Sequence, residues 1–204
     1  MLSPTITLSI KQEHTVKKIT ILLFVLLLTG CSTRYPLTTN LKLQVNNQPF
    51  GIYTDENSAT LKGHDARKES AVVVYQLTGE PEIQIPNQSA PHFLVTEQLA
   101  AGLQEQGLVF ESTSPVRIEL DVNELVAVVT RPKLLYSAKA KSHLTLTIRN
   151  KAVSLTKTYN REANRDSLTR PPVQDLETLL NDQLTDIVNQ ILQDEEVQVT
   201  IRKR

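Results

Sequence analysis

Three stretches between residues 116 and 159 alternate apolar and polar side chains with a period of two. This alternation is typical of half-buried strands, and it predicts three strands in succession, with a turn at Arg131-Pro132. Directly paired residues must point to one face of a sheet, so a turn centred on Asn150-Lys151 predicts that Ile148 lies opposite Val153. The same register places Leu146 opposite Leu155. The apolar rows are Val116, Ile118, Leu120, Val122, Val126 and Val128; Ala138, Ala140, Leu144, Leu146 and Ile148; and Val153, Leu155 and Tyr159.

Two further segments repeat apolar residues at helical spacing. The first predicts a helix over residues 91–106, with Pro91 at its start and Gly107 just past its end. The second follows Pro171-Pro172 and has acidic residues in its first turn, where the helix dipole favours negative charge. The apolar stripes are Val95, Leu99 and Leu103 in the first helix, and Val173, Leu176, Leu180, Leu184, Ile187 and Ile191 in the second.

The remaining segments give weaker patterns. Short alternations predict strands over residues 41–45 and 50–54 and a last strand over residues 197–201, and the apolar run of residues 71–77 predicts a buried strand. Residues 54–70 are polar without clear periodicity and are interpreted as a loop. Strands separated by two helices indicate an α+β fold, in which an antiparallel sheet carries two amphipathic helices packed on one face.

The amino-terminal region resembles a bacterial lipoprotein signal peptide with its lipobox. Lys17-Lys18 precede ten residues, 19–28, that are apolar except for Thr20, and Thr29, Gly30 and Cys31 follow in order. The resemblance implies cleavage between Gly30 and Cys31, a diacylglycerol on the Cys31 thiol and an acyl chain on its new amino terminus. The alternative is a membrane helix, but ten residues span only about 15 Å, half of the hydrocarbon core.

The chain therefore divides into a signal peptide over residues 1–30, a lipidated Cys31 with a tether to residue 40, and one periplasmic α+β domain over residues 41–204. Residues 1–15 carry no signal-peptide features, which suggests that translation starts at Val16. Ser32 follows the cysteine, and by resemblance to enterobacterial sorting rules a residue other than Asp there favours the outer membrane. The predicted location is the periplasmic face of that membrane.

Composition excludes several classes of function. The chain has 22 basic and 22 acidic residues, and removal of Lys11, Lys17, Lys18 and Glu13 with the signal peptide leaves two more acids than bases. This balance does not favour nucleic-acid binding. The single cysteine, once lipidated, can form neither a disulfide nor a zinc site nor a catalytic thiolate.

The histidines show no catalytic or metal-ligating spacing. The mature chain has His64, His92 and His143, without an HExxH pattern, and it has no GxSxG or GxGxxG motif. We therefore expect no enzyme activity, no metal and no cofactor other than the acyl chains on Cys31. A hydrolase with an unrecognised site remains an alternative.

Charge is distributed unevenly along the sequence. Residues 131–170 hold ten Lys or Arg against two acids, whereas residues 173–196 hold seven acids and no basic residue. The basic segment supplies a candidate face for an anionic partner, such as an envelope protein or lipid headgroups. Two solvated faces are the simpler interpretation. The candidate residues are Lys139, Lys141, His143 and Arg149.

Residues 90–110 (APHFLVTEQLAAGLQEQGLVF), followed by Val116-Arg-Ile-Glu-Leu-Asp-Val, resemble the YajG family of small lipoproteins. The resemblance covers about residues 71–195 and the lipobox, and it implies an outer-membrane lipoprotein without a defined biochemical role. The predicted function is a non-enzymatic binding or scaffold module of the cell envelope. The alternative is an auxiliary subunit of an envelope transport or assembly complex.

Overall fold

The computed structural model describes residues 35–54, 56–151 and 153–203, and residues 36–204 form one compact unit. The predicted signal peptide, the predicted cleavage site between Gly30 and Cys31 and the predicted lipidation site Cys31 lie outside the described residues. The helices and strands are β1 (Ser58–Asp65), β2 (Ala71–Gln76), β3 (Ile83–Pro86), α2 (Pro91–Glu105), β4 (Val109–Phe110), β5 (Val116–Thr130), β6 (Tyr136–Asn150), β7 (Val153–Ser167), α3 (Val173–Gln193) and α4 (Glu195–Arg202).

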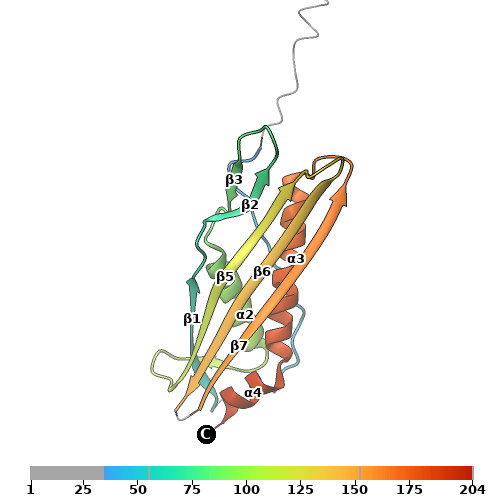
Figure 1. Ribbon diagram of the computed structural model, residues 1–204. Coiled ribbons are helices and arrows are strands. Elements are labelled where there is room, and N and C mark those ends of the chain that lie inside the picture. The colour runs from blue at the N-terminus through green and yellow to red at the C-terminus, as the bar shows by residue number, and fades with distance from the viewer. Residues whose placement is uncertain (1–34, 55, 152, 204) are drawn as a thin grey trace, which may run out of the picture. The chain divides into compact units, whose positions relative to one another are not determined.

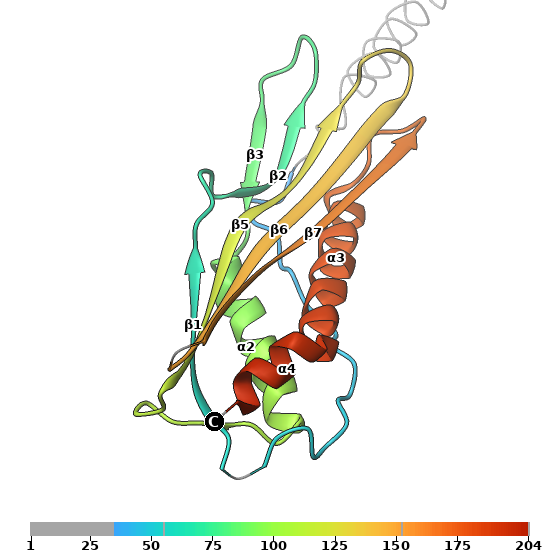
Figure 2. The same cartoon turned by 60° about the horizontal axis from the view of Figure 1, so that its bottom comes forward.

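The α+β class and the packing of helices on the sheet are confirmed (Figures 1 and 2). The long strand β5 is antiparallel to β6, and β6 is antiparallel to β7. On the other side of β5, β1 and β2 follow one another along its length, and both run parallel to it. The sheet is therefore mixed rather than wholly antiparallel, because two strands enter from the chain before α2.

The turn between β6 and β7 lies one residue farther along the chain than predicted. Ile148 pairs with Leu155 rather than Val153, and Leu146 pairs with Lys157, so the register is shifted by two residues from the prediction. The apolar rows still share a face, because a shift of two keeps the side-chain alternation. Pairing continues as far as Asn150 and Val153, and the turn residue Lys151 takes φ 51°.

A β-bulge in β5 changes which residues face the helices. Val122 pairs with Leu144, but Glu124 pairs with His143, so Asn123 is the extra residue. Beyond the bulge, the fully buried residues of β5 are odd-numbered: Leu125, Ala127 and Val129. The prediction that Val126 and Val128 continue the buried row is wrong for this reason, since both are only half-buried on the opposite face.

The predicted strand at residues 41–45 is an extended segment that runs along α3 instead of joining the sheet. We call residues 40–46 the strap. Leu41 and Leu43 are buried, which explains the alternation in the sequence. The backbone N–H groups of every second strap residue donate to side chains of every fourth α3 residue: Asn40 to Glu177 (2.9 Å), Lys42 to Asn181 (2.8 Å), Gln44 to Thr185 (3.3 Å) and Asn46 to Asn189 (3.1 Å).

The two periodicities match closely. Two extended residues advance about 6.6 Å and four helical residues about 6.0 Å, so the spacing drifts by about 2 Å over the three steps of the strap. The strap runs in the same direction as α3, from the amino-terminal end of the helix toward its carboxyl end. Just ahead of it, the Thr39 backbone N–H donates to the Pro86 carbonyl oxygen at 2.9 Å.

Three other weak predictions are wrong. Residues 54–70 contain β1, because the long neighbour β5 supplies its pairing partners where the sequence shows little periodicity. Residues 50–54 form no strand and are instead fixed by the Tyr53 backbone N–H, which donates to the Gln106 carbonyl oxygen at 3.0 Å. Residues 197–201 form α4, whose first turn is capped by Asp194, so Val197 and Ile201 share one buried helical face.

The predictions for α2 and α3 are confirmed. The helix α2 lies behind β1 and β5, while α3 lies behind β5, β6 and β7. The apolar stripe of α3 is buried, and Leu180 is fully inaccessible. One buried polar residue, Gln183, interrupts that stripe. Its side chain accepts from Ser142 Oγ (2.7 Å) and donates to the Ala140 carbonyl oxygen (3.3 Å), which satisfies the buried amide. Within the described part of the chain, no helix is long and apolar enough to cross a membrane.

Candidate binding surface on the outer face of the sheet

The four basic residues of the candidate face lie on β6 and point away from the helices. They alternate with Ala138, Ala140 and Ser142, which are buried against the helical layer. Lys139, Lys141 and His143 lie together, near the bulge of β5. Arg149 is six residues beyond His143 along the strand, about 20 Å away, so it belongs to a separate part of the surface.

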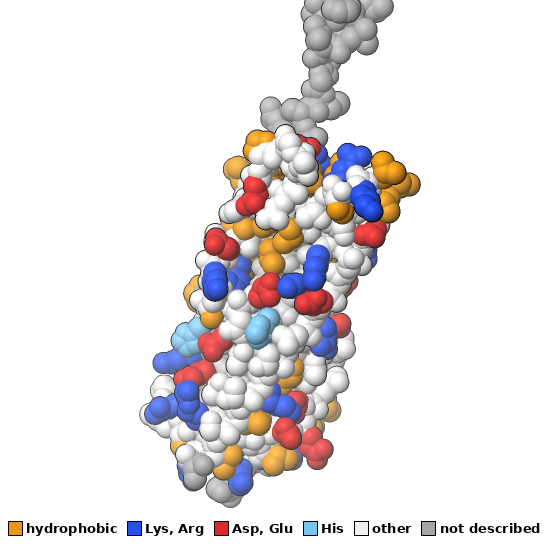
Figure 3. Space-filling view, in the orientation of Figure 1, with side chains coloured by type: hydrophobic (Ala, Val, Ile, Leu, Met, Phe, Trp, Pro, Cys, Tyr) orange, Lys and Arg blue, Asp and Glu red, His pale blue; other side chains and the backbone are white. Residues whose placement is uncertain are grey.

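Acidic side chains of the neighbouring strands compensate these cations. The Lys139 ammonium lies 3.3 Å from a Glu162 oxygen, and the Lys141 ammonium lies 3.8 Å from Glu162 and 3.9 Å from Glu124. Arg149 pairs in the same way with Glu119 at 2.6 Å. The outer face therefore carries interspersed charges of both signs (Figure 3), rather than the uniformly cationic surface that the sequence of β6 alone indicates.

The acidic segment of residues 173–196 lies on the opposite side of the sheet from Lys139 and Lys141, so these charges do not face each other. Among the described ion pairs, the basic segment of residues 131–170 meets this acidic segment at one place only, through Lys157 of β7, whose side chain faces the helices. Its ammonium lies 2.7 Å from Asp194 and 2.7 Å from Glu196, and the Tyr159 hydroxyl donates to Asp194 at 3.1 Å.

This contact shifts the titration of its members. Burial raises the pKa of Asp194, but hydrogen bonds from Lys157, the Val197 backbone N–H and Tyr159 outweigh it and hold that pKa below its usual value. Hydrogen bonds to Asp194 and Glu196 raise the pKa of Lys157. Since Asp194 also caps α4, we assign this cluster to fastening α4 to the sheet.

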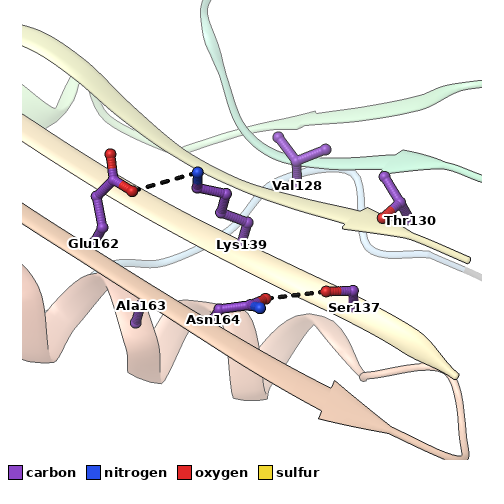
Figure 4. A pocket seen from close by; sticks show the side chains of 7 residues that line it. All are labelled: Val128, Thr130, Ser137, Lys139, Glu162, Ala163 and Asn164. Carbon is purple, nitrogen blue, oxygen red and sulfur yellow. Dashed lines mark hydrogen bonds and ion pairs between the residues drawn. The ribbon is translucent and has the colours of Figure 1, made fainter. Parts of the chain in front are cut away.

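Two open depressions lie side by side on the outer face. The first has a volume of about 500 Å³ and is bordered by β5, β6 and β7, with the Lys139–Glu162 pair and the Ser137–Asn164 hydrogen bond (3.0 Å) across it (Figure 4). The second measures about 720 Å³ and lies between residues 66–69, β2, β3 and the bulge of β5. Val126 and Val128 separate them, because the bulge turns these apolar residues outward.

A buried arginine borders the larger depression. The side chain of Arg67 is only 6% exposed, and its Nε and Nη2 atoms each donate to Asp65 at 2.8 Å. This bidentate hydrogen bond lowers the pKa of Asp65. Sequence reasoning missed this site because it interpreted residues 54–70 as a loop, and the signal that was available is the Asp-x-Arg spacing itself.

The described residues show no arrangement typical of a catalytic or metal site. His64, His92 and His143 lie on β1, α2 and β6, and no group of three or more described His, Cys, Asp or Glu residues could hold a metal ion. The arrangement can bind a partner with an apolar surface and mixed charges, through Val126, Val128 and the charged residues around them.

Comparison with known families identifies the chain. A family profile described as uncharacterized lipoprotein, Lipoprotein_16, matches residues 43–202. The chain belongs to this family. The match confirms the resemblance to YajG-like lipoproteins, and it includes the strap from Leu43 onward. A search of curated proteins found no match.

Three solved structures are similar to this one at low sequence identity. Protein XCC0632 from Xanthomonas campestris, of family DUF330, is 11% identical, with a TM-score of 0.56 over 81% of this chain and 96% of that one. A candidate neuraminyllactose-binding hemagglutinin homologue from Helicobacter pylori is 11% identical, with a TM-score of 0.48 over 81% and 97% of the two chains. A candidate lipoprotein from Caulobacter crescentus CB15 is 11% identical, with a TM-score of 0.36 over 64% and 92%. Only the first likeness is close enough to support a shared fold.

Proposed function

We propose that this lipoprotein is held by acyl chains on Cys31 at the periplasmic face of the outer membrane, where its domain is a non-enzymatic binding or scaffold module. Family membership supports a membrane-anchored envelope protein. The lipobox supports Cys31 as the anchor, and Ser32 supports the outer membrane.

The observation that carries the proposal is the strap. Eight residues separate Cys31 from Asn40, and these nine steps along the chain reach at most about 30 Å when fully extended. From Asn40 onward the chain is hydrogen-bonded to α3 at every second residue. The domain therefore cannot move far from its anchor, which suits a module that acts at the membrane surface.

The anchoring is tested by three substitutions in the native host. Cys31→Ser should block processing and leave an uncleaved precursor, seen as a larger band on a gel. Ser32→Asp should move the protein from the outer-membrane to the inner-membrane fraction of a density gradient, whereas the control Ser32→Ala should not. Normal cleavage of Cys31→Ser, or identical fractionation of the two Ser32 variants, would contradict the proposal.

The binding role is tested by crosslinking in intact envelopes. The double variant Lys139→Glu with Lys141→Glu should lose its partner, and the control Arg149→Glu, at a distant position on the same strand, should keep it. Recovery of a defined set of transport or assembly proteins would favour the auxiliary-subunit alternative. Turnover that a single Ser or Asp substitution abolishes would instead identify a hydrolase.

A further inference from the structure

Exposed leucines gather at one end of the domain, on two loops that we call the tip, residues 131–135 and 168–170. Leu134 is 80% exposed and Leu168 is 81% exposed, while Leu135 is 41% exposed. Soluble surfaces seldom cluster large apolar side chains in this way unless they bind something. Figure 3 shows the apolar and basic side chains together at this end of β5, β6 and β7.

The two loops form one surface. Tyr136 pairs with Ser167 at the last position of the β6–β7 ladder, directly behind both loops. The guanidinium of Arg131 lies 4.9 Å from the centre of the Tyr136 ring, and that of Arg170 lies 6.0 Å from it. The leucines therefore project beyond a common base of Tyr136 and two arginines.

The charge of the tip is basic. Residues 131–135 and 168–170 contain Arg131, Lys133 and Arg170 and no acid. Two acidic residues adjoin these loops: Glu80, which is bonded to Arg170 at 2.6 Å, and Asp166 near the end of β7, so Arg131 and Lys133 are the cations proposed to meet the headgroups. Leucines flanked by cations are typical of protein surfaces that enter the interface of an anionic bilayer.

The chain enters the domain at this same end (Figure 1). The tip is followed directly by α3, and the strap begins at the amino-terminal end of α3, with Asn40 bonded to Glu177. Ahead of it, Leu37 is 91% exposed. Only four residues separate Cys31 from Pro36, so these five steps along the chain span at most about 18 Å.

We propose that the tip docks on the bilayer that holds the acyl chains of Cys31, with Leu134 and Leu168 in the interface and Arg131 and Lys133 on anionic headgroups. This inference rests on the proposed acylation of Cys31 and deepens it, because it fixes which end of the domain meets the membrane. In that orientation the long strands extend away from the membrane, and the outer face of the sheet is open to the periplasm.

The test uses tryptophan fluorescence as the reporter, and it has no tryptophan background because the chain contains no tryptophan. The acylated mature protein carrying Leu134→Trp or Leu168→Trp is reconstituted into vesicles of phosphatidylethanolamine and phosphatidylglycerol, some with brominated acyl chains. The matched control is Phe50→Trp, an 86% exposed aromatic position beyond the far end of the strap. We expect blue-shifted emission and bromine quenching for both tip reporters, and neither effect for the control.

A charge variant tests the role of the cations. Adding Lys133→Glu to Leu168→Trp should lower the quenching on these vesicles, whereas adding Lys62→Glu, an exposed position on β1, should leave it unchanged. Tip reporters that behave like Phe50→Trp would overturn the docking. So would a blue shift seen in native envelopes but not in pure lipid, because the occupant would then be a protein.

Mass spectrometry of the amino-terminal peptide separates the two proposals. A chain without acyl groups would refute the anchoring and, with it, the docking that depends on it. An acylated chain whose tip stays in water would refute the docking alone.

Discussion

The hydrogen bonds of the strap predict a local effect of substitution at Asn181. Its side-chain oxygen accepts from the Lys42 backbone N–H at 2.8 Å, and Asn181→Ala removes that acceptor. A hydrogen bond of this kind contributes about 1 kcal/mol, because water can replace it at a partly exposed position. Since 1.4 kcal/mol corresponds to a factor of ten, hydrogen exchange at the Lys42 amide should accelerate about fivefold.

Local exchange is a better readout than global stability here. Alanine is a better helix former than asparagine, so the substitution also stabilises α3 by about 0.5 kcal/mol and masks part of the loss in the global free energy of unfolding. Asp182→Ala is the matched control, because it is an exposed α3 position that makes a similar gain in helix propensity. Exchange at Lys42, Gln44 and Asn46 should be unchanged in the control. If Lys42 exchanges equally fast in both variants, the strap is not held by these side chains.

Three further changes have expected outcomes. Leu180→Ala should lower the free energy of unfolding in urea by about 2–5 kcal/mol, since this side chain is fully buried, and a loss under about 0.5 kcal/mol would contradict its packing. The lowered pKa of Asp194 adds stability that is present above the pKa of the unfolded chain, near 4, and is lost as the pH falls through the folded pKa. The melting temperature should therefore fall less steeply with acidification in Asp194→Asn than in the unsubstituted protein, and an identical dependence on pH would contradict this. Reversing Lys139 and Lys141 to Glu should weaken partner association but change stability by no more than about 1 kcal/mol per exposed ion pair, and a larger drop in melting temperature would show that their pairs with Glu162 are structural.

The sequence predicted the elements whose periodicity extends over several turns or residue pairs. The helices α2 and α3 and the strands β5, β6 and β7 are each 15 or more residues long, and the spacing that repeats within them separates a period of 3.6 from a period of two. Three alternating residues do not. Val197 and Ile201 are equally spaced for a strand face or for one helical turn, and Asp194 decides for the helix by capping its first turn.

Other features depend on contacts that are remote in sequence. The strap has the alternation of a strand, yet its hydrogen-bond partners are helix side chains 137–143 residues away. The bulge at Asn123 reverses the inward face of β5 without any break in the alternation before it. The alternation of the sequence alone predicts that the basic residues of β6 share one face. Their ion pairs with Glu119, Glu124 and Glu162 depend on strand registers that the sequence does not specify.

The hydrogen bonds of Gln183 and Thr39 have a joint consequence for the register of the strap on α3. The strap meets equivalent acceptors at every fourth residue of α3, so a slide of about 6 Å along the helix would exchange each acceptor for the next with little change in energy. A leucine-rich helix face tolerates such a slide as well. The Gln183 amide has its partners, Ser142 and the Ala140 carbonyl, at one position only, and leaving a buried amide unpaired costs about 1–3 kcal/mol. Gln183 thus fixes α3 against β6, and the Thr39 backbone N–H, which donates to the Pro86 carbonyl oxygen at 2.9 Å, fixes the strap against the sheet. The two contacts together leave the repeating ladder between the strap and α3 only one register.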